Sequence, residues 1–304
     1  MKHAPADVAP ALLAHARPSS TQHIADFVAL TKPRLNMLVV ATSAAGYYLG
    51  HLAALDWVTM AHAAVGTALV AGGAAALNQV YERDTDALMR RTRMRPLPDG
   101  RVTPAEALWY GLLLCVAGLL QLAVTTNVLA AGLALATLVT YIGVYTPLKR
   151  RSALATIVGA VPGALPPMIG WAAARGSVSI GAWVLFAIVF LWQLPHFMAI
   201  TWMYRDDYGK AGFPMLPVIE PDGRRTGREA VTYAAALVPA SLAPAIAGVS
   251  GPIYFGIAIA LGLAFLALAV RFASARNDRT ARGLFYGSIT YLPLLWIAMI
   301  ADKL

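Results

Sequence analysis

Residues 58–86 read VTMAHAAVGTALVAGGAAALNQVYERDTD, a long apolar run that ends directly in a cluster of acidic residues. A helix needs about 20 apolar residues to cross the hydrocarbon core of a bilayer, and the apolar part of this run reaches that length. The run is too long and too uninterrupted for a strand of a membrane barrel. This stretch therefore predicts a transmembrane helix with a charged site at one end.

The rest of the chain repeats this apolar pattern. Hydrophobic residues make up 59% of the 304 residues and charged residues only 13%, against about 25% charged in ordinary soluble domains. This composition excludes a disordered chain and an ordinary soluble domain, and the single cysteine, Cys115, is expected to be a small core side chain. We expect an all-α polytopic membrane protein, a bundle of nine transmembrane helices. The nine stretches are 35–55, 58–80, 105–124, 128–147, 153–173, 180–204, 230–249, 253–270 and 284–301.

The basic residues are distributed unevenly over the predicted loops. The formal net charge is +9, and every Lys and Arg except Arg175 and Lys303 falls in the N-terminal segment or in loops on the same side of the membrane. This bias marks the cytoplasmic side, so we expect the N-terminus in the cytoplasm and the C-terminus outside. It also accounts for the positive charge without a nucleic-acid partner. The chain divides into a flexible cytoplasmic tail, 1–25, and a single intramembrane domain, 26–304.

Three polar residues near the end of the second stretch lie four positions apart. Asn78, Glu82 and Asp86 would share one face of a helix, whereas Asp84 would point elsewhere. Carboxylates on one face repel one another unless a cation lies between them, and oxygen ligands suit Mg²⁺. The spacing therefore suggests a magnesium site. The alternative is a solvated acidic helix end whose carboxylates pair with nearby arginines: Arg83, Arg90 and Arg91.

Basic residues follow this acidic cluster and also end later helices. Arg91 and Arg95 lie in the next loop, Lys149 follows the fourth stretch, and Lys210 follows the sixth. Arginine binds phosphate in a bidentate manner and lysine binds it as a point charge. Together with the acidic residues they suggest a metal–diphosphate site, although basic residues at helix ends also serve as anchors to lipid headgroups.

The sixth stretch ends in a second acidic pair, Asp206 and Asp207, on the same side of the membrane as the first cluster. The second and sixth helices run in the same direction, so both clusters can meet in one cavity. His196 lies two to three turns further in, where it would coordinate a cofactor iron, act as an acid or base, or bond to a neighbouring helix. Trp192 and Tyr145 would surround an apolar chain or stabilise a cation with their π faces; the alternative is an interfacial aromatic belt.

In combination, these motifs resemble the UbiA-type intramembrane prenyltransferases and, within them, the heme branch. The first signature runs from Asn78 through Glu82-Arg83-Asp84-Thr85-Asp86 to Arg95-Pro96-Leu97. The resemblance extends from about residue 26 to 300. Its other matches are at 31–34 (TKPR), 145–150 (YTPLKR), 162–171 (PGALPPMIGW), 192–197 (WQLPHF) and 206–217 (DDYGKAGFPMLP).

The resemblance implies an activity and its ligands. A member of the heme branch transfers the farnesyl group of farnesyl diphosphate to the vinyl group of heme B, giving heme O and diphosphate. It would lie in the bacterial inner membrane, surrounded by lipid, with a heme A synthase or terminal oxidase as downstream partner. Its Mg²⁺ would be held by Asn78, Glu82 and Asp86. The implied catalytic residues are Asn78, Glu82, Asp84, Asp86, Asp206 and Asp207, and the substrate-binding residues are Arg91, Arg95, Tyr145, Lys149, Lys210, His196 and Trp192.

The sequence departs from the family pattern in two places. Glu82 stands where the family usually has Asp, and Tyr204 and Tyr208 stand where quinone-type relatives have aspartates. The tyrosines favour a heme acceptor over the alternative, a quinone precursor or another aromatic acceptor. Two alternatives of a different class are a membrane transporter, which the short and nearly chargeless outer loops disfavour, and a non-catalytic heme chaperone.

Overall fold

The computed structural model describes residues 20–52 and 54–304, which form an almost entirely helical bundle. Within these ranges the single β pairing is a bridge between Ser250 and Lys303, and the predicted all-α fold is confirmed. The elements are α1 (Ser20–Leu30), α2 (Pro33–Gly50), α3 (Trp57–Leu88), α4 (Pro104–Thr125), α5 (Val128–Val139), the π-helix η1 (Thr140–Tyr145), α6 (Thr146–Leu148), α7 (Ala155–Ala164), α8 (Pro166–Arg175), α9 (Ile180–Met203), α10 (Arg205–Lys210), α11 (Leu216–Ile219), α12 (Arg224–Ile246), α13 (Pro252–Ala275) and α14 (Asp278–Ala301).

Eight helical segments in the described ranges are long and apolar enough to cross a membrane. They coincide with eight of the nine predicted stretches, and two of them, Val128–Leu148 and Ala155–Arg175, are built from consecutive shorter helices. The first predicted stretch, 35–55, forms α2, which has 18 residues and begins with polar Arg34 and Asn36. The nine predicted helices are thus close to the eight segments that qualify by length and composition in the described ranges.

The predicted flexible tail, 1–25, lies mostly outside the described residues. Its last part, 20–25, forms the beginning of α1. Asp26 of α1 pairs with Arg101 at 3.1 Å, so this helix is fixed to the loop that precedes α4. The domain boundary expected at residue 25 therefore falls inside a helix.

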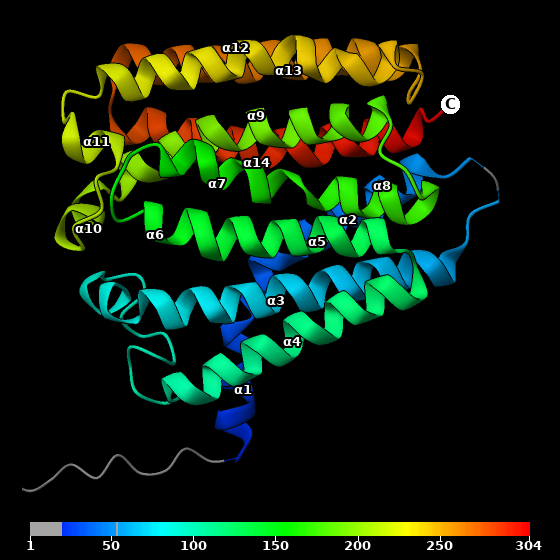
Figure 1. The fold of residues 1–304 in the computed structure, drawn as a ribbon. Helices are drawn as coiled ribbons and strands as arrows, with labels where there is room; N and C mark the ends of the chain where they lie inside the picture. The colour runs from blue at the N-terminus through cyan, green and yellow to red at the C-terminus, as the bar shows by residue number, and fades with distance from the viewer. Residues whose placement is uncertain (1–19, 53) are drawn as a thin grey trace, which may run out of the picture.

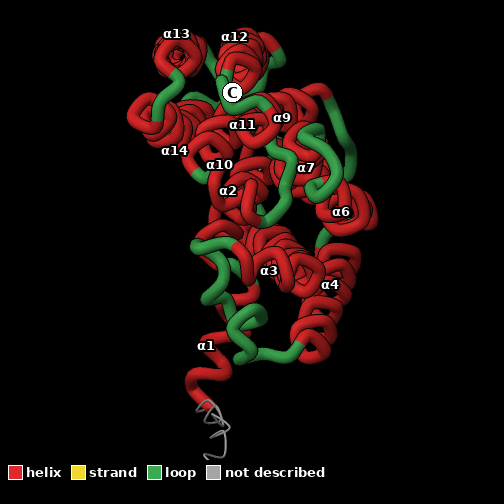
Figure 2. Tube along the Cα trace, turned by 90° about the vertical axis from the view of Figure 1, so that its left-hand side faces the viewer, coloured by secondary structure: helices red, strands yellow, loops and turns green. Residues whose placement is uncertain are grey.

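The long helices lie side by side in Figure 1, so the bundle has two ends. One end carries α10, α11 and the loop that follows α3, and the C-terminus lies at the other. We call the first of these the loop end. Figure 2 looks onto it: α3 and α4 form one part of the bundle, α9, α12, α13 and α14 form another, and α2 and α7 lie between them. The acidic segment of α3 is thus at the loop end.

Small residues let the helices approach closely, as is typical of membrane bundles. A Cβ added to Gly73 of α3 would lie 2.5 Å from the Sγ of Cys115 and 2.6 Å from the carbonyl oxygen of Gly111, both on α4. Gly170 of α8 lies just as tightly against the backbone carbonyl of Ser43 on α2. Cys115 is buried, as expected of a core side chain. These contacts set the spacing of α2, α3, α4 and α8.

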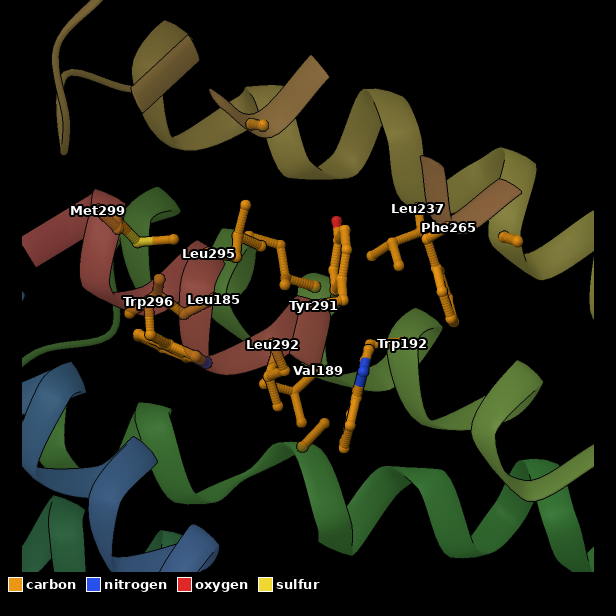
Figure 3. Packing of buried hydrophobic residues seen from close by; sticks show 14 of the residues in the cluster. Leu185, Val189, Trp192, Leu237, Phe265, Tyr291, Leu292, Leu295, Trp296 and Met299 are labelled. Carbon is orange, nitrogen blue, oxygen red and sulfur yellow. The ribbon is translucent and has the colours of Figure 1, made fainter. Parts of the chain in front are cut away.

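The largest apolar cluster joins α9, α12, α13 and α14. Figure 3 shows Leu185, Val189 and Trp192 of α9 beside Tyr291 and Leu292 of α14. Because lipid tails are as apolar as these side chains, such contacts stabilise the bundle mainly through close van der Waals packing. The cluster also includes residues of α2, α7 and α8 but none of α3 or α4.

Candidate functional site

The acidic residues of α3 lie on a continuous helix, because α3 extends to Leu88, beyond the predicted end of the apolar stretch at residue 80. Asn78, Glu82 and Asp86 face inward and are 2%, 2% and 0% exposed. We call these three residues the acidic face. Asp84 points the other way, with a side chain 83% exposed. The side-chain directions therefore follow the four-residue spacing.

Two cations from separate segments pair with the carboxylates of the acidic face. Lys149, which follows α6, donates to Oε1 and Oε2 of Glu82 at 3.0 and 3.2 Å. Arg95, in the loop after α3, donates to Oδ2 of Asp86 at 2.6 Å. Both cations were expected near a diphosphate site, and the structure brings both to the acidic face.

The π-helix η1 helps to place Lys149. A π turn adds one residue to the helical repeat and occurs frequently at functional sites. Here Thr146, which follows η1 (Thr140–Tyr145), donates from its hydroxyl to the carbonyl of Tyr141 at 2.8 Å. The same hydroxyl accepts a bond from Nδ2 of Asn78 at 3.3 Å. The end of η1 is thereby attached to α3, one turn of helix before Lys149.

Lys32 is a third cation at the acidic face and is absent from the site residues predicted above. Its Nζ donates to Oδ1 of Asn78 at 3.1 Å. Its backbone is left-handed, with φ 48° and ψ 57°, a conformation that costs a residue other than glycine about 1–2 kcal/mol. Burial and the nearby Arg95 lower the pKa of Lys32 to about 7. The available signal was its position in the matched segment 31–34 (TKPR), directly before Pro33 at the start of α2.

The loop after α9 contacts the cations of the site through aromatic side chains. Arg91 donates to the hydroxyl of Tyr208 at 2.7 Å. Its guanidinium lies 4.8 Å from the ring centre of Tyr208 and 5.2 Å from that of Tyr204. The ring of Phe213 lies 4.8 Å from Nζ of Lys149. Tyr204 and Tyr208, which stand where quinone-type relatives have aspartates, therefore position the guanidinium of Arg91.

The acidic pair of this loop lies apart from these contacts. Asp206 and Lys210 are exposed, and Asp207 is half-buried. The two loops do meet, because Met89 and Tyr208 belong to one buried cluster at the loop end. Their meeting brings aromatic side chains, rather than Asp206, to the cations around the acidic face.

His196 and Trp192 lie deeper along α9 and pack against α14. Nδ1 of His196 is 2.7 Å from the hydroxyl of Ser288, and its ring stacks between Trp192 and Phe285 with ring centres 5.2 and 5.1 Å away. Nε1 of Trp192 donates to the carbonyl of Ser288 at 2.8 Å. Trp192 is buried in the apolar cluster of Figure 3, so it supports His196 rather than lining an open surface.

The acidic face has the donors that a magnesium ion requires. Oδ1 of Asp86 is buried and has no hydrogen-bond partner, and a buried carboxylate oxygen without a partner is costly. Within the described ranges no three His, Cys, Asp or Glu side chains form a metal site by themselves. Two carboxylates and the amide of Asn78 suit Mg²⁺, which keeps several waters and completes its shell with substrate phosphates.

Comparison with known proteins places this arrangement in a family. The model of the UbiA prenyltransferase family matches residues 39–296. Proteins named protoheme IX farnesyltransferase are 47% identical over 287 residues in Solibacter usitatus, covering 91% of this chain and 98% of the relative, and 43% identical over 302 residues in Koribacter versatilis, covering 96% and 97%. The chain belongs to the UbiA prenyltransferase family and is an integral membrane protein.

Solved structures with low sequence identity share the fold. A digeranylgeranylglyceryl phosphate synthase superposes with a TM-score of 0.78 at 16% identity, covering 92% of this chain and 98% of that one. A UbiA homologue from Archaeoglobus fulgidus, solved with GPP and Mg²⁺, gives a TM-score of 0.64 at 16% identity and covers 91% and 99%. The helical arrangement described above is therefore the fold of the family.

Proposed function

We propose that this chain transfers the farnesyl group of farnesyl diphosphate to a vinyl group of heme B, giving heme O and diphosphate. The relatives named protoheme IX farnesyltransferase, matched over nearly the whole chain, support this donor and acceptor. The observation that carries the proposal is the acidic face of α3 with cations gathered around it from separate loops. Such a set of oxygen donors and cations suits a metal-bound diphosphate.

The residues around the acidic face would stabilise the leaving diphosphate. Arg91, Arg95 and Lys149 would donate to its oxygens as negative charge builds up on them. Mg²⁺ bound to the acidic face would neutralise the diphosphate and make it a better leaving group. Four residues of the predicted site are exposed or half-buried and lie outside this group: Asp84, Asp206, Asp207 and Lys210. They would therefore make no direct contact with the leaving group.

The transfer itself would take place among the helices, away from bulk water. The allylic C–O bond breaks and the diphosphate departs with the electron pair, which leaves a farnesyl cation. The π electrons of the heme vinyl group form the new C–C bond, and water then adds a hydroxyl group and releases a proton. The ring of Tyr145, 6.0 Å from Nζ of Lys149, would present its π face to the passing cation.

His196 is the proposed contact to heme. Its Nδ1 is engaged by Ser288, which would fix the ring and turn Nε2 toward the iron, as second partners do for metal-binding histidines. Stacking on Trp192 holds the plane of the ring. Replacing His196 by Ala should weaken heme binding in a Soret titration, and an unaltered titration would count against the contact.

The loop end is proposed to face the cytoplasm. The basic residues of the site lie at this end, together with most of the chain's other Lys and Arg, and such residues accumulate on the cytoplasmic side of bacterial inner membranes. The C-terminus lies at the opposite end of the bundle (Figure 1). Cysteine labelling of intact cells at an exposed loop-end position would test this orientation.

Acceptor competition tests the proposed reaction. Purified protein in vesicles receives farnesyl diphosphate and Mg²⁺ with either heme B or 4-hydroxybenzoate, and products are identified by mass spectrometry. Heme O should form only with heme B. A prenylated benzoate would favour the quinone-precursor activity instead, and no product with either acceptor would contradict the proposal.

A further inference from the structure

The turn between α1 and α2 holds Lys32 in an unfavourable backbone conformation. Lys32 and Arg276 are the residues other than glycine with positive φ in the described ranges, and Lys32 is also followed by Pro33, which restricts it further. Such a conformation persists where the surrounding structure enforces it, and it is found preferentially at functional sites.

Contacts of the residues before and after Lys32 stabilise this turn. Leu30 is fully buried against Ala76 of α3 and its neighbours, and Nε2 of Gln79 donates to the Leu30 carbonyl at 2.7 Å. On the other side, Nδ2 of Asn36 donates to the carbonyl of Thr31 at 2.5 Å. Gln79 is the neighbour of Asn78 in α3, so α3 holds both the backbone of the turn and the side chain of Lys32.

The charges around the acidic face do not balance. Glu82 pairs with Lys149 and Asp86 pairs with Arg95, whereas Lys32 donates its hydrogen bond to the neutral amide oxygen of Asn78. Glu82 and Asp86 attract Lys32 at longer range, but each is already paired with another cation. A half-buried ammonium group without a carboxylate of its own is unfavourable until an anion arrives. The turn thus places a surplus positive charge at the acidic face.

We propose that Lys32 binds the diphosphate of the prenyl donor, and that α1 and its turn serve to hold it over the acidic face. This inference rests on the proposed function. Lys32 adds a third cation from a separate segment to Arg95 and Lys149, and its left-handed backbone is the cost of placing the ammonium group there. Arg34, two residues further on, is exposed and takes no part.

The test compares stability and diphosphate binding in the same variants. Lys32→Gly relieves the left-handed backbone and removes the charge, so the melting temperature of the ligand-free protein should stay the same or rise. Its Kd for inorganic diphosphate with Mg²⁺, measured by calorimetry, should increase about tenfold or more, as for the loss of a charged hydrogen bond. The KM for farnesyl diphosphate should increase with it, and the KM for heme B should not change.

Two further variants distinguish a diphosphate-binding role of Lys32 from a purely structural one. Lys32→Met keeps most of the side-chain length but removes the charge, so it should weaken diphosphate binding as Lys32→Gly does. Arg34→Ala should bind as the wild type. Wild-type affinity in both Lys32 variants would overturn the inference, as would a lower melting temperature with unchanged affinity, which would make Lys32 a structural residue. If the wild type itself binds no diphosphate, the proposed function fails instead.

Discussion

Replacement of Asp86 by Asn should separate the roles of this carboxylate in folding and in catalysis. Asp86 is fully buried, with Oδ2 2.6 Å from NH1 of Arg95 and Oδ1 without a hydrogen-bond partner. An amide keeps the shape of the side chain but removes its charge. Arg95 would then lose its counter-ion, and a metal ion would lose one of two carboxylate ligands.

The effect on folding follows from the geometry of the pair. At 2.6 Å the gross attraction of two unit charges is about 6 kcal/mol at an effective dielectric constant of ~20, and desolvation offsets most of it. Removing one partner of a buried pair costs about 3–5 kcal/mol. The Arg95 side chain is 29% exposed, so water replaces part of the lost contact, and we expect the free energy of unfolding to fall by about 2–3 kcal/mol.

The effect on catalysis should be larger and should depend on magnesium. Charge stabilisation by a bound metal is worth several kcal/mol, and a loss of about 3–4 kcal/mol in the transition state lowers kcat/KM about 10²–10³-fold. Heme O formation is measured in vesicles across a Mg²⁺ titration, with rates divided by the folded fraction. Asp84→Asn is the matched control, because Asp84 is on the same helix but exposed, and it should change stability by less than about 0.5 kcal/mol. Wild-type kcat/KM and unchanged magnesium dependence in Asp86→Asn would rule out a metal-binding role for this carboxylate.

Three further predictions concern the position of Tyr145 and the packing of the bundle. Gly159→Ala places a Cβ 2.6 Å from the ring of Tyr145 and should lower kcat/KM about tenfold by displacing that ring; activity equal to the wild type would exclude a role for its position. In Gly170→Ala the added Cβ would clash with the backbone of α2, so the free energy of unfolding in a denaturation assay should fall by about 1–3 kcal/mol. Gly132→Ala is the control, because its Cβ would have no neighbour, and its free energy of unfolding should not change. Lys303→Ala removes bonds to two carbonyls at the end of α2 and should lower the melting temperature by about 2 °C, with unchanged farnesyl transfer.

Local patterns predicted much of the fold and the centre of the site. Apolar length located the membrane helices, and the four-residue spacing of Asn78, Glu82 and Asp86 predicted their common face, because both properties are repeated along a single helix. The same spacing separated Asp84 from that face. Where the prediction differs from the structure, as in the short α2 and the helical start of the predicted tail, the segment has mixed polarity and its length depends on its neighbours.

The tertiary structure decided which remote residues meet the acidic face. Lys32, Lys149 and Tyr208 reach the site only through a strained turn, a π-helix and a folded loop, and none of these is encoded by hydropathy. Asp206 was expected to meet Asp86 in one cavity, yet it is exposed, and its neighbour Tyr208 contacts Arg91 instead. The membrane helices and the acidic face depend on short-range periodicity, so they could be predicted from the amino-acid order alone. The partners of the acidic face depend on how closely distant helices cross, which is fixed only when the bundle packs.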